Sequence, residues 1–309
     1  MKQATKKIAT LLLSALLVLA MFAGCAPRTQ APTVTQAPAA QAPASSFDTS
    51  REIAVISREE GSGTRGAFIE LMGVEVKDAD GKKVDNTTVE AAITNDTAVM
   101  LTTVAGNPYA IGYISLGSLN DTVKALEIDG AQATVENIKS GTYAVSRPFN
   151  IATKGEVSAA AQDFINYILS ADGQAVIEGN KYIKVAEDAA AYAASGASGK
   201  IVVAGSSSVT PVMEKLAEAY QALNADVEIE IQQSDSTTGM QSAIDGICDI
   251  GMASREVKDS ELEAGLIPTV IAIDGIAVIV NNENSLTGLT KDQVRGIFVG
   301  ETLTWDEVA

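Results

Sequence analysis

The chain has 309 residues, enough for two domains of ordinary size, and 46% of them are hydrophobic, so it can build buried cores. Its net charge is −17, which argues against nucleic acid as a partner, because that binding needs a basic surface. Histidine is absent, which excludes Ser-His-Asp and Cys-His nucleophilic centres and the common His metal sites, and so argues against a typical hydrolase.

The first 50 residues have the pattern of an export signal followed by a tether. Lysines precede an apolar run over residues 8–23, which is short for a membrane span. The run ends in Ala-Gly directly before Cys25, and this resembles the bacterial lipobox. The resemblance implies a lipoprotein signal peptide over 1–24 and lipid attachment to the Cys25 thiol. Residues 25–50 are rich in Ala and Pro and are predicted to form an extended tether.

The stretch 57–65, Ser-Arg-Glu-Glu-Gly-Ser-Gly-Thr-Arg, lies between a strand-like apolar run at 53–56 and helical spacing at 67–72. The first amides of a helix have no intrahelical acceptor and lie at the positive end of its dipole. With glycines, hydroxyls and a guanidinium beside them, they can hold a tetrahedral oxyanion. The residues expected to make this socket are Arg58, Ser62, Gly63 and Thr64.

Further along, strand-like and helical segments alternate, and an Ala/Gly-rich linker is predicted over 185–199. After the linker, a buried strand followed by Gly-Ser-Ser-Ser and a helix repeats the first socket, at 200–223. The other predicted segments are a hairpin at 76–85, a helix within 86–103, strands at 110–116, 123–128 and 133–138, helices at 157–170 and 173–178, a strand at 227–232, a helix from about Gly239, a strand at 249–253, two strand-like runs within 267–281, and a helix at 290–298.

This alternation predicts an α/β fold with largely parallel sheets, in which ligands lie at the carboxyl ends of strands. Two weaker sockets are predicted at 235–239 and 254–255. The Gly/Ser loops do not fit a Walker A motif, and there is no GxGxxG fingerprint, so the sequence argues against nucleotide binding.

Several of these segments resemble motifs of the phosphate-binding proteins of the phosphate-specific ABC transporter, the PstS family. Residues 201–211 are similar to the amino-terminal motif of that family, and 249–255 to a second motif. Residues 58–64 resemble a third and more specific motif, and 107–113 and 170–174 also fit. The similarity covers nearly everything after residue 50.

The resemblance implies a two-lobed, type II periplasmic-binding-protein-like α/β fold with a hinge and a central ligand cleft. The implied parts are one lobe over 51–140 plus 282–309 with the GSGT motif, a second lobe over 150–272 with the GSSS motif, and hinge crossings at 139–150 and 272–282.

The order of the motifs differs from the usual one. Residues 51–184 resemble the later part of the family sequence, and 200–309 the earlier part. The chain therefore resembles a circular permutant in which the linker 185–199 joins the usual ends, an arrangement that is tolerated where termini lie close together. The alternative is a pair of fragments that swaps halves with a second copy.

The family's phosphate-binding residues carry over onto matching positions. The positions implied are Arg58, Ser62, Gly63, Thr64, Ser207, Ser208, Ser236 and Arg255. Glu60 falls where an acidic residue can hold Arg58, and Asp235 lies in a loop that departs from the family's glycine-rich pattern. Arg255 stands where some members have an Asp that accepts the phosphate proton. Without that Asp, Glu60, Asp235 or a backbone carbonyl must accept the proton, or the selectivity for phosphate over sulfate is weaker.

Taken together, these patterns predict an extracytoplasmic, lipid-anchored solute-binding protein that captures inorganic phosphate and delivers it to ABC permease subunits. We expect a monomer without enzymatic activity, cofactor or metal. Alternatives are a binding protein for sulfate or molybdate, and a phosphate sensor that serves no transporter. An exported hydrolase with Ser62 or Ser207 as nucleophile would need a Ser-Lys pair or a metal, and neither loop has a Ser-x-x-Lys motif.

Overall fold

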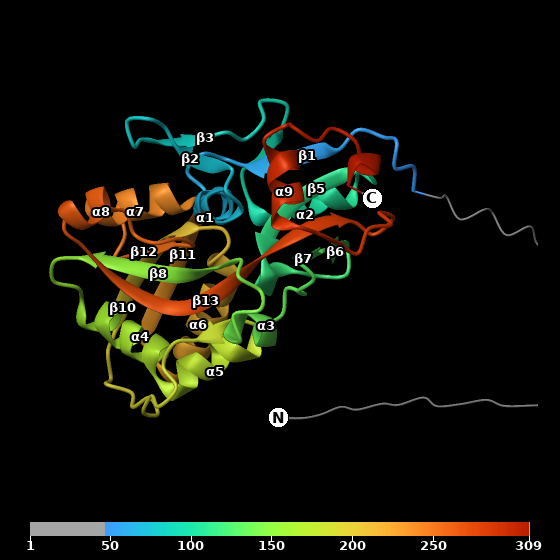
Figure 1. Ribbon diagram of the computed structural model, residues 1–309. Coiled ribbons are helices and arrows are strands. Elements are labelled where there is room, and N and C mark those ends of the chain that lie inside the picture. Colours follow the sequence, from blue (N-terminus) through green and yellow to red (C-terminus); the bar gives the residue numbers. More distant parts are fainter. Residues whose placement is uncertain (1–46, 309) are drawn as a thin grey trace, which may run out of the picture. The chain divides into compact units, whose positions relative to one another are not determined.

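The computed structural model describes residues 47–308 (Figure 1). Cys25, the expected signal peptide and most of the expected tether lie outside the described residues. Among the described residues, no helix combines the length and the apolar character that crossing a membrane would require.

Strands and helices alternate along the chain, as the sequence predicts. Those before residue 140 are β1 (Ala54–Arg58), α1 (Gly63–Met72), β2 (Glu75–Lys77), β3 (Lys83–Asp85), β4 (Ala92–Thr94), α2 (Thr97–Ala105), β5 (Ala110–Ser115), η1 (Leu116–Ser118), β6 (Val123–Ala125), β7 (Glu127–Ile128) and α3 (Val135–Lys139). The next are β8 (Ser146–Lys154), α4 (Ala159–Leu169), α5 (Ala171–Gly179), β9 (Ile183–Lys184), β10 (Gly199–Ser206), α6 (Thr210–Leu223), β11 (Val227–Ser234), α7 (Ser236–Ile244), β12 (Ile250–Ala253), α8 (Asp259–Glu263) and β13 (Leu266–Asn281). The last are β14 (Gly288–Leu289), α9 (Lys291–Phe298) and η2 (Trp305–Glu307).

One curled sheet runs through both lobes in the order β11-β10-β12-β8-β13-β5-β1-β4. At one end β10 pairs in parallel with β11 and β12, and at the other β1 pairs in parallel with β4 and β5. Between them, β13 pairs antiparallel with β8 over residues 266–275 and with β5 over 276–280 (Figure 1). The predicted α/β architecture with two lobes is confirmed, but the sheet is mixed and not largely parallel, because β13, the strand that the lobes share, pairs antiparallel with its neighbours and β8 pairs antiparallel with β12.

Two separate sets of buried side chains show where the lobes divide. In one lobe the apolar clusters draw only on residues between Phe149 and Ala272. In the other they draw on residues up to Val145 and from Ile276 onwards. The chain therefore passes between the cores at 145–149 and at 272–276, within the two ranges expected from the resemblance, and we propose these segments as the hinge.

Three details of the local structure differ from the sequence predictions. Residues 133–138 were expected as a strand but belong largely to helix α3, whose N-cap Thr134 accepts a hydrogen bond from the Asn137 amide. The two strand-like runs within 267–281 form the single strand β13, interrupted only by a register shift near Val270. Helix α7 begins at Ser236, three residues before the predicted start, because Asp235 caps it.

The two ends of the described chain lie side by side. The Ile53 amide donates to the Leu303 carbonyl at 2.8 Å, and the Trp305 amide donates to the Arg51 carbonyl at 3.2 Å. These are the segments that would be continuous in the usual family order, so their closeness supports our inference of a circular permutation.

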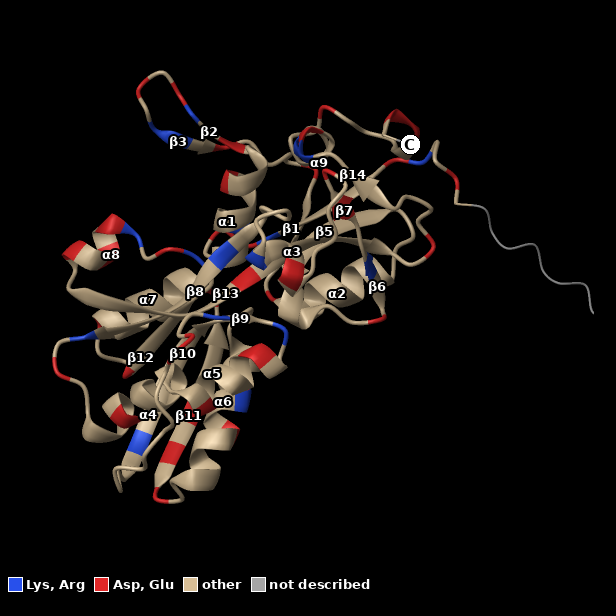
Figure 2. Ribbon diagram, turned by 60° about the horizontal axis from the view of Figure 1, so that its bottom comes forward, with Lys and Arg blue, Asp and Glu red and all other residues tan. Residues whose placement is uncertain are grey.

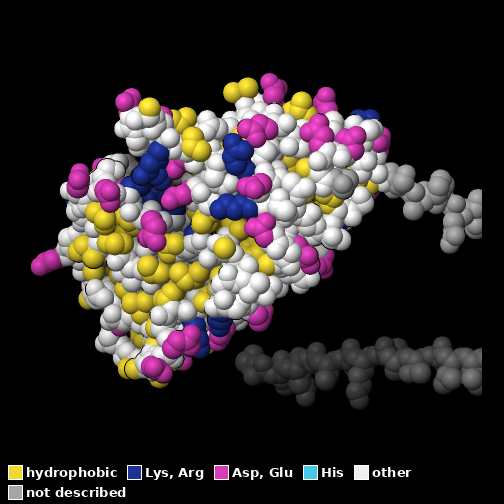
Figure 3. Space-filling view, in the orientation of Figure 1, with side chains coloured by type: hydrophobic (Ala, Val, Ile, Leu, Met, Phe, Trp, Pro, Cys, Tyr) yellow, Lys and Arg dark blue, Asp and Glu magenta, His cyan; other side chains and the backbone are white. Residues whose placement is uncertain are grey.

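Charge is distributed unevenly over the surface. The β2–β3 hairpin stands away from the body and carries the exposed Lys83, which pairs with Glu75 at 2.8 Å and Glu70 at 3.1 Å (Figure 2). On the face seen in Figure 3, acidic side chains are spread over both lobes, whereas several Lys and Arg side chains gather around the position of α1. Acidic side chains lie among these Lys and Arg side chains in the same view, so positive and negative charges are mixed there (Figure 3).

Candidate functional site

Arg58 is the last residue of β1 and is held at the junction of the two lobes. The residue is 2% exposed, and its guanidinium donates to the Glu59 carboxylate from Nε at 2.7 Å and from Nη2 at 2.6 Å. Nη2 also donates to Ser207 Oγ of the other lobe at 3.1 Å. The acidic residue that holds this arginine is therefore Glu59 and not Glu60, whose side chain lies exposed in the following turn.

Helix α1 starts inside the junction. Ser62 is its N-cap, and its hydroxyl accepts from the Arg65 amide at 3.3 Å. Thr64 is 1% exposed, and its Oγ1 lies 2.7 Å from Ser208 Oγ across the junction. At Gly63 an added Cβ would lie 2.3 Å from Ser236 Oγ, so glycine is required for this close approach.

The opposite lobe contributes three loop ends. Ser207 and Ser208 follow β10, and Ser236 is the first residue of α7. Ser254 follows β12; its amide donates to Ser236 Oγ at 3.1 Å, and its Oγ accepts from Ser206 Oγ at 2.9 Å. Parallel strands place these loop ends at one edge of the sheet, as the sequence predicts.

Six hydroxyl groups meet here, and we call them the hydroxyl cluster: Thr64, Thr97, Ser207, Ser208, Ser236 and Ser254. Each of these residues is at most 7% exposed. Thr97 was missed from the sequence, whereas Ser254 belongs to the weaker socket predicted at 254–255 but was not among the expected phosphate-binding residues. Thr97 Oγ1 lies 3.4 Å from both Ser207 Oγ and Ser208 Oγ, and Ser254 Oγ lies 3.4 Å from Thr64 Oγ1. Asp96 before Thr97 is the N-cap of α2, a local signal for a helix start that does not by itself place Thr97 beside Ser207 and Ser208.

Arg255 lies at the edge of this cluster with its charge already paired. Nη1 and Nη2 donate to the Glu261 carboxylate at 2.9 and 2.7 Å, and Nη2 approaches Thr237 Oγ1 at 3.4 Å. Burial opposes ionisation of Glu261, but hydrogen bonds from Arg255 and from the Lys258 amide outweigh it and lower the pKa of Glu261. The guanidinium thus stabilises a neighbouring loop, while the aliphatic stem of Arg255 lies against the start of α1.

Asp235 is the N-cap of α7. Its carboxylate accepts from the Thr238 amide at 2.9 Å and from Thr238 Oγ1 at 2.6 Å, which caps α7. The carboxylates expected to receive a ligand proton, Glu60 and Asp235, therefore lie in solvent or in a cap.

Tyr113 packs beside the first socket and contacts the end of β1 through its hydroxyl. Its hydroxyl lies 2.9 Å from Ser57 Oγ and accepts from the Arg58 amide at 3.2 Å. Burial raises the pKa of Tyr113 to about 12, so the phenol stays neutral. Its ring stacks on Phe68 of α1 with centroids 3.9 Å apart. Tyr113 and Trp305 are both fully buried, in agreement with their predicted packing roles.

This geometry suits a tetrahedral oxyanion. Hydroxyls can donate to its oxygens, and the first amides of α1, α2 and α7 carry the positive end of a helix dipole. Arg58 and Arg255 are each balanced by a glutamate, so binding would depend on oriented dipoles and hydrogen bonds more than on net charge. Within residues 47–308, no three Cys, Asp or Glu side chains gather to form a metal site.

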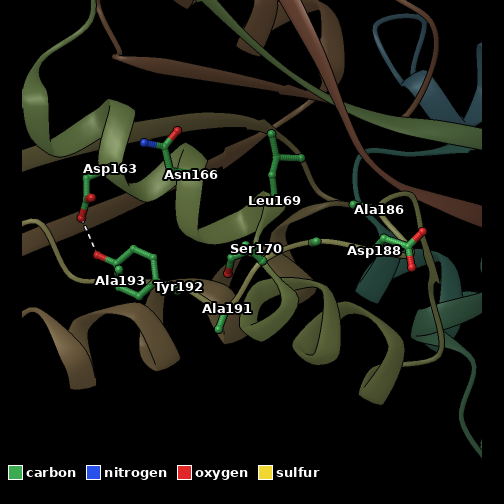
Figure 4. A pocket seen from close by; sticks show the side chains of 11 residues that line it. Asp163, Asn166, Leu169, Ser170, Ala186, Asp188, Ala191, Tyr192 and Ala193 are labelled. Carbon is green, nitrogen blue, oxygen red and sulfur yellow. Dashed lines mark hydrogen bonds between the residues drawn. The ribbon is translucent and has the colours of Figure 1, made fainter.

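A separate surface cavity of 490 Å³ lies between α4 and the segment 186–193 (Figure 4). Tyr192 lines it and donates to Asp163 Oδ2 at 2.5 Å, which attaches part of the linker 185–199 to this lobe. None of its lining residues belongs to the hydroxyl cluster.

Two lobes that meet over a cluster of polar loop ends define the chain as a periplasmic-type solute-binding protein. A family model described as "PBP superfamily domain" matches residues 45–172 and 190–309. The chain is 59% identical over 266 residues to "Phosphate-binding protein PstS 2" of Streptococcus agalactiae, covering 86% of this chain and 90% of that protein. It is 46% identical over 268 residues to the PstS 2 of Streptococcus pneumoniae, covering 87% and 91%.

The chain belongs to the PstS family of phosphate-binding proteins. The crystal structure of a phosphate ABC transporter phosphate-binding protein from Streptococcus pneumoniae is also similar, with 46% identity and a TM-score of 0.67, covering 84% of this chain and 100% of that one. Because the streptococcal sequences match over nearly their whole length, they share the order of segments found here.

Proposed function

We propose that this protein is an extracytoplasmic, lipid-anchored receptor that binds inorganic phosphate between its lobes and delivers it to the permease subunits of an ABC importer. The observation that carries the proposal is the hydroxyl cluster, to which both lobes contribute and which Arg58 bridges through Ser207. The names of the streptococcal relatives support phosphate as the anion and transport as the purpose.

The residues proposed to contact phosphate come from both sides of the junction. They are Arg58, Ser62, Gly63, Thr64, Ser207, Ser208, Ser236 and Arg255, to which we add Thr97 and Ser254. Both added residues have hydroxyls within 3.5 Å of others in the set. In our proposal, opening of the lobes admits the anion and closure surrounds it with donors.

A second candidate is another tetrahedral oxyanion, such as sulfate or molybdate. It is favoured by the pairing of the nearby carboxylates, since Glu59 and Glu261 are bound to arginines and Asp235 caps a helix. A carboxylate free to accept a proton is what distinguishes protonated phosphate from sulfate. In its absence, the hydroxyls must accept that proton, which they can do because each is both donor and acceptor.

Calorimetric titration of the purified protein with phosphate, sulfate and molybdate tests both candidates. We expect saturable heat with phosphate at micromolar concentration and weaker binding of the other anions. The absence of heat with phosphate, or tighter binding of sulfate, would reject phosphate as the ligand. Turnover of a chromogenic phosphate ester would instead revive the exported hydrolase.

Membrane attachment and transport need tests in cells. We expect Cys25→Ser to release the protein from the membrane fraction, and deletion of the gene to reduce phosphate uptake. Unchanged uptake would favour a phosphate sensor that serves no transporter. Sedimentation analysis checks the proposed monomer, and a dimer would favour the exchange of halves between two copies.

A further inference from the structure

A buried ion pair, Arg147–Asp274, lies where β13 passes from one lobe to the other. Asp274 of β13 is opposite Arg147 of β8, and two residues later Ile276 is opposite Ser115 of β5. Arg147 Nη2 lies 3.0 Å from Asp274 Oδ2, and both side chains are at most 2% exposed. The pair thus occupies the proposed hinge.

Three hydroxyls adjoin the pair, and we call the five residues the hinge cluster: Arg147, Asp274, Tyr182, Ser115 and Ser118. The Tyr182 hydroxyl lies near those of Ser115 and Ser118, and Asp274 faces Ser115 and the amides of Leu116 and Gly117. Tyr182 packs in the core of one lobe, the two serines belong to β5 and η1 of the other, and Arg147 lies on β8 in the proposed hinge segment between them. Apart from the ion pair, the polar side-chain atoms of these five residues form no hydrogen bond of standard geometry within residues 47–308.

The stability of the fold does not explain why a buried ion pair with unpaired hydroxyls beside it stands at this position. Removing two charges from water is costly, and well-packed apolar residues of similar volume usually stabilise a core as well or better. Burial raises the pKa of Asp274 to about 6, although Arg147 opposes the rise, so the cost of burying the carboxylate is not fully offset. An ion pair in a low dielectric does, however, have an energy that varies steeply with distance. It therefore favours a narrow range of inter-strand geometry.

Strand β5 joins this cluster to the anion socket. Ser115 and Tyr113 are two residues apart and so lie on the same face of the strand. The Tyr113 hydroxyl accepts from the Arg58 amide at 3.2 Å. Beyond Ser115, in η1, the chain packs tightly against the other lobe, because an added Cβ at Gly117 would lie 2.1 Å from the Tyr182 ring. A change of angle at the hinge cluster therefore moves the strand that supports Arg58.

From this placement we propose that Arg147 and Asp274 are positioning residues for ligand binding, which hold the lobes at the angle where Arg58 and Thr64 meet Ser207 and Ser208. The proposal rests on phosphate being the ligand. The pair acts through β5 and β13 and does not touch the anion.

The decisive variant replaces both charges with apolar side chains, Arg147→Met together with Asp274→Leu. We expect an unfolding temperature equal to or above that of the wild type, with the Kd for phosphate raised by about tenfold or more. We also expect a smaller decrease in the radius of gyration when phosphate is added. The matched control is Lys215→Met with Glu218→Leu, a 3.0 Å ion pair on the exposed side of α6, which should leave the Kd unchanged.

A double variant that folds and binds phosphate within about twofold of the wild type overturns the proposal. If the variant does not fold, hydrogen exchange of the wild type decides. Phosphate should slow amide exchange in the peptides over 115–118 and 146–150, and unchanged exchange there would overturn the proposal. Phosphate binding by the wild type is measured first, so that failure of the proposed function is distinguished from failure of the hinge cluster.

Discussion

Thr64→Val is the sharpest test of the hydroxyl cluster, because it removes one hydroxyl and keeps the shape of the side chain. Thr64 Oγ1 lies 2.7 Å from Ser208 Oγ and 3.4 Å from Ser254 Oγ, so it joins the two lobes. With 1% of its surface exposed, water cannot replace the lost group. The variant should therefore weaken closure onto an anion.

The size of the effect follows from the type of hydrogen bond. A hydrogen bond to a charged group contributes about 1.5–3 kcal/mol when it is buried. Since each 1.4 kcal/mol corresponds to about a factor of ten, the Kd for phosphate should rise by about 10- to 150-fold. Stability without ligand should fall by no more than about 1–3 kcal/mol, the cost of leaving a buried partner hydroxyl unpaired.

Calorimetric titration gives the Kd, and thermal unfolding without phosphate shows that the variant is folded. Thr102→Val is the control, since Thr102 is exposed on α2 and its hydroxyl bonds only to backbone carbonyls of its own helix. Thr64→Ser should retain most of the affinity. A folded Thr64→Val protein with a Kd within about twofold of the wild type would show that this hydroxyl does not bind the anion.

Three further predictions follow from packing and charge. Gly63→Ala should raise the phosphate Kd by about tenfold or more, because its Cβ would lie 2.3 Å from Ser236 Oγ and would hold the two loop ends apart. An unchanged Kd in calorimetry contradicts this. Phe68→Ala should lower the free energy of unfolding, measured by urea denaturation, by about 3–5 kcal/mol, because the ring is fully buried. A loss of less than about 1 kcal/mol would contradict this packing role. Folding raises the pKa of Asp274 from 3.8 to about 6, so the folded state binds this proton more tightly than the unfolded state does. The stability that this proton provides is fully present below about pH 4 and is lost as the pH rises through 6. The free energy of unfolding should fall by about 3 kcal/mol over this window. In urea titrations across this window the difference between Asp274→Asn and wild type should change by that amount, and a constant difference would refute the raised pKa.

Local chemistry made the α/β fold and the first socket predictable. Ser62 is the N-cap of α1, because its hydroxyl accepts a hydrogen bond from the Arg65 amide. A Ser placed before the helical spacing is a sequence signal for the start of a helix. The Gly-Ser-Ser-Ser turn after β10 repeats the pattern, and parallel pairing of β10 with β11 and β12 brings the loop ends of that lobe to one edge.

Long-range pairing could not be derived in the same way. Whether Glu59 or Glu60 holds Arg58 depends on the residue at which β1 ends, and element boundaries are the least certain part of a sequence prediction. The polar Asp274 with Gly275 interrupts the apolar pattern of β13, and this suggested two strands, although β13 continues through the interruption, which lies in the segment that we propose as the hinge. Thr97 enters the cluster from a helix start 33 residues after Thr64, a distance that no local pattern spans.

The paired arginines also bear on how an acidic protein could hold an anion. With a net charge of −17, the overall field repels a phosphate, and each of the two arginines near the cluster already has a glutamate beside it. Attraction must then come from hydroxyls and helix amides that are aimed at one point and act over a few ångströms. Such interactions operate only when both lobes are closed, which makes affinity depend directly on the hinge geometry. For this reason the charged pair Arg147–Asp274, although it lies outside the hydroxyl cluster, is where we expect affinity to be most readily altered without changing a binding residue.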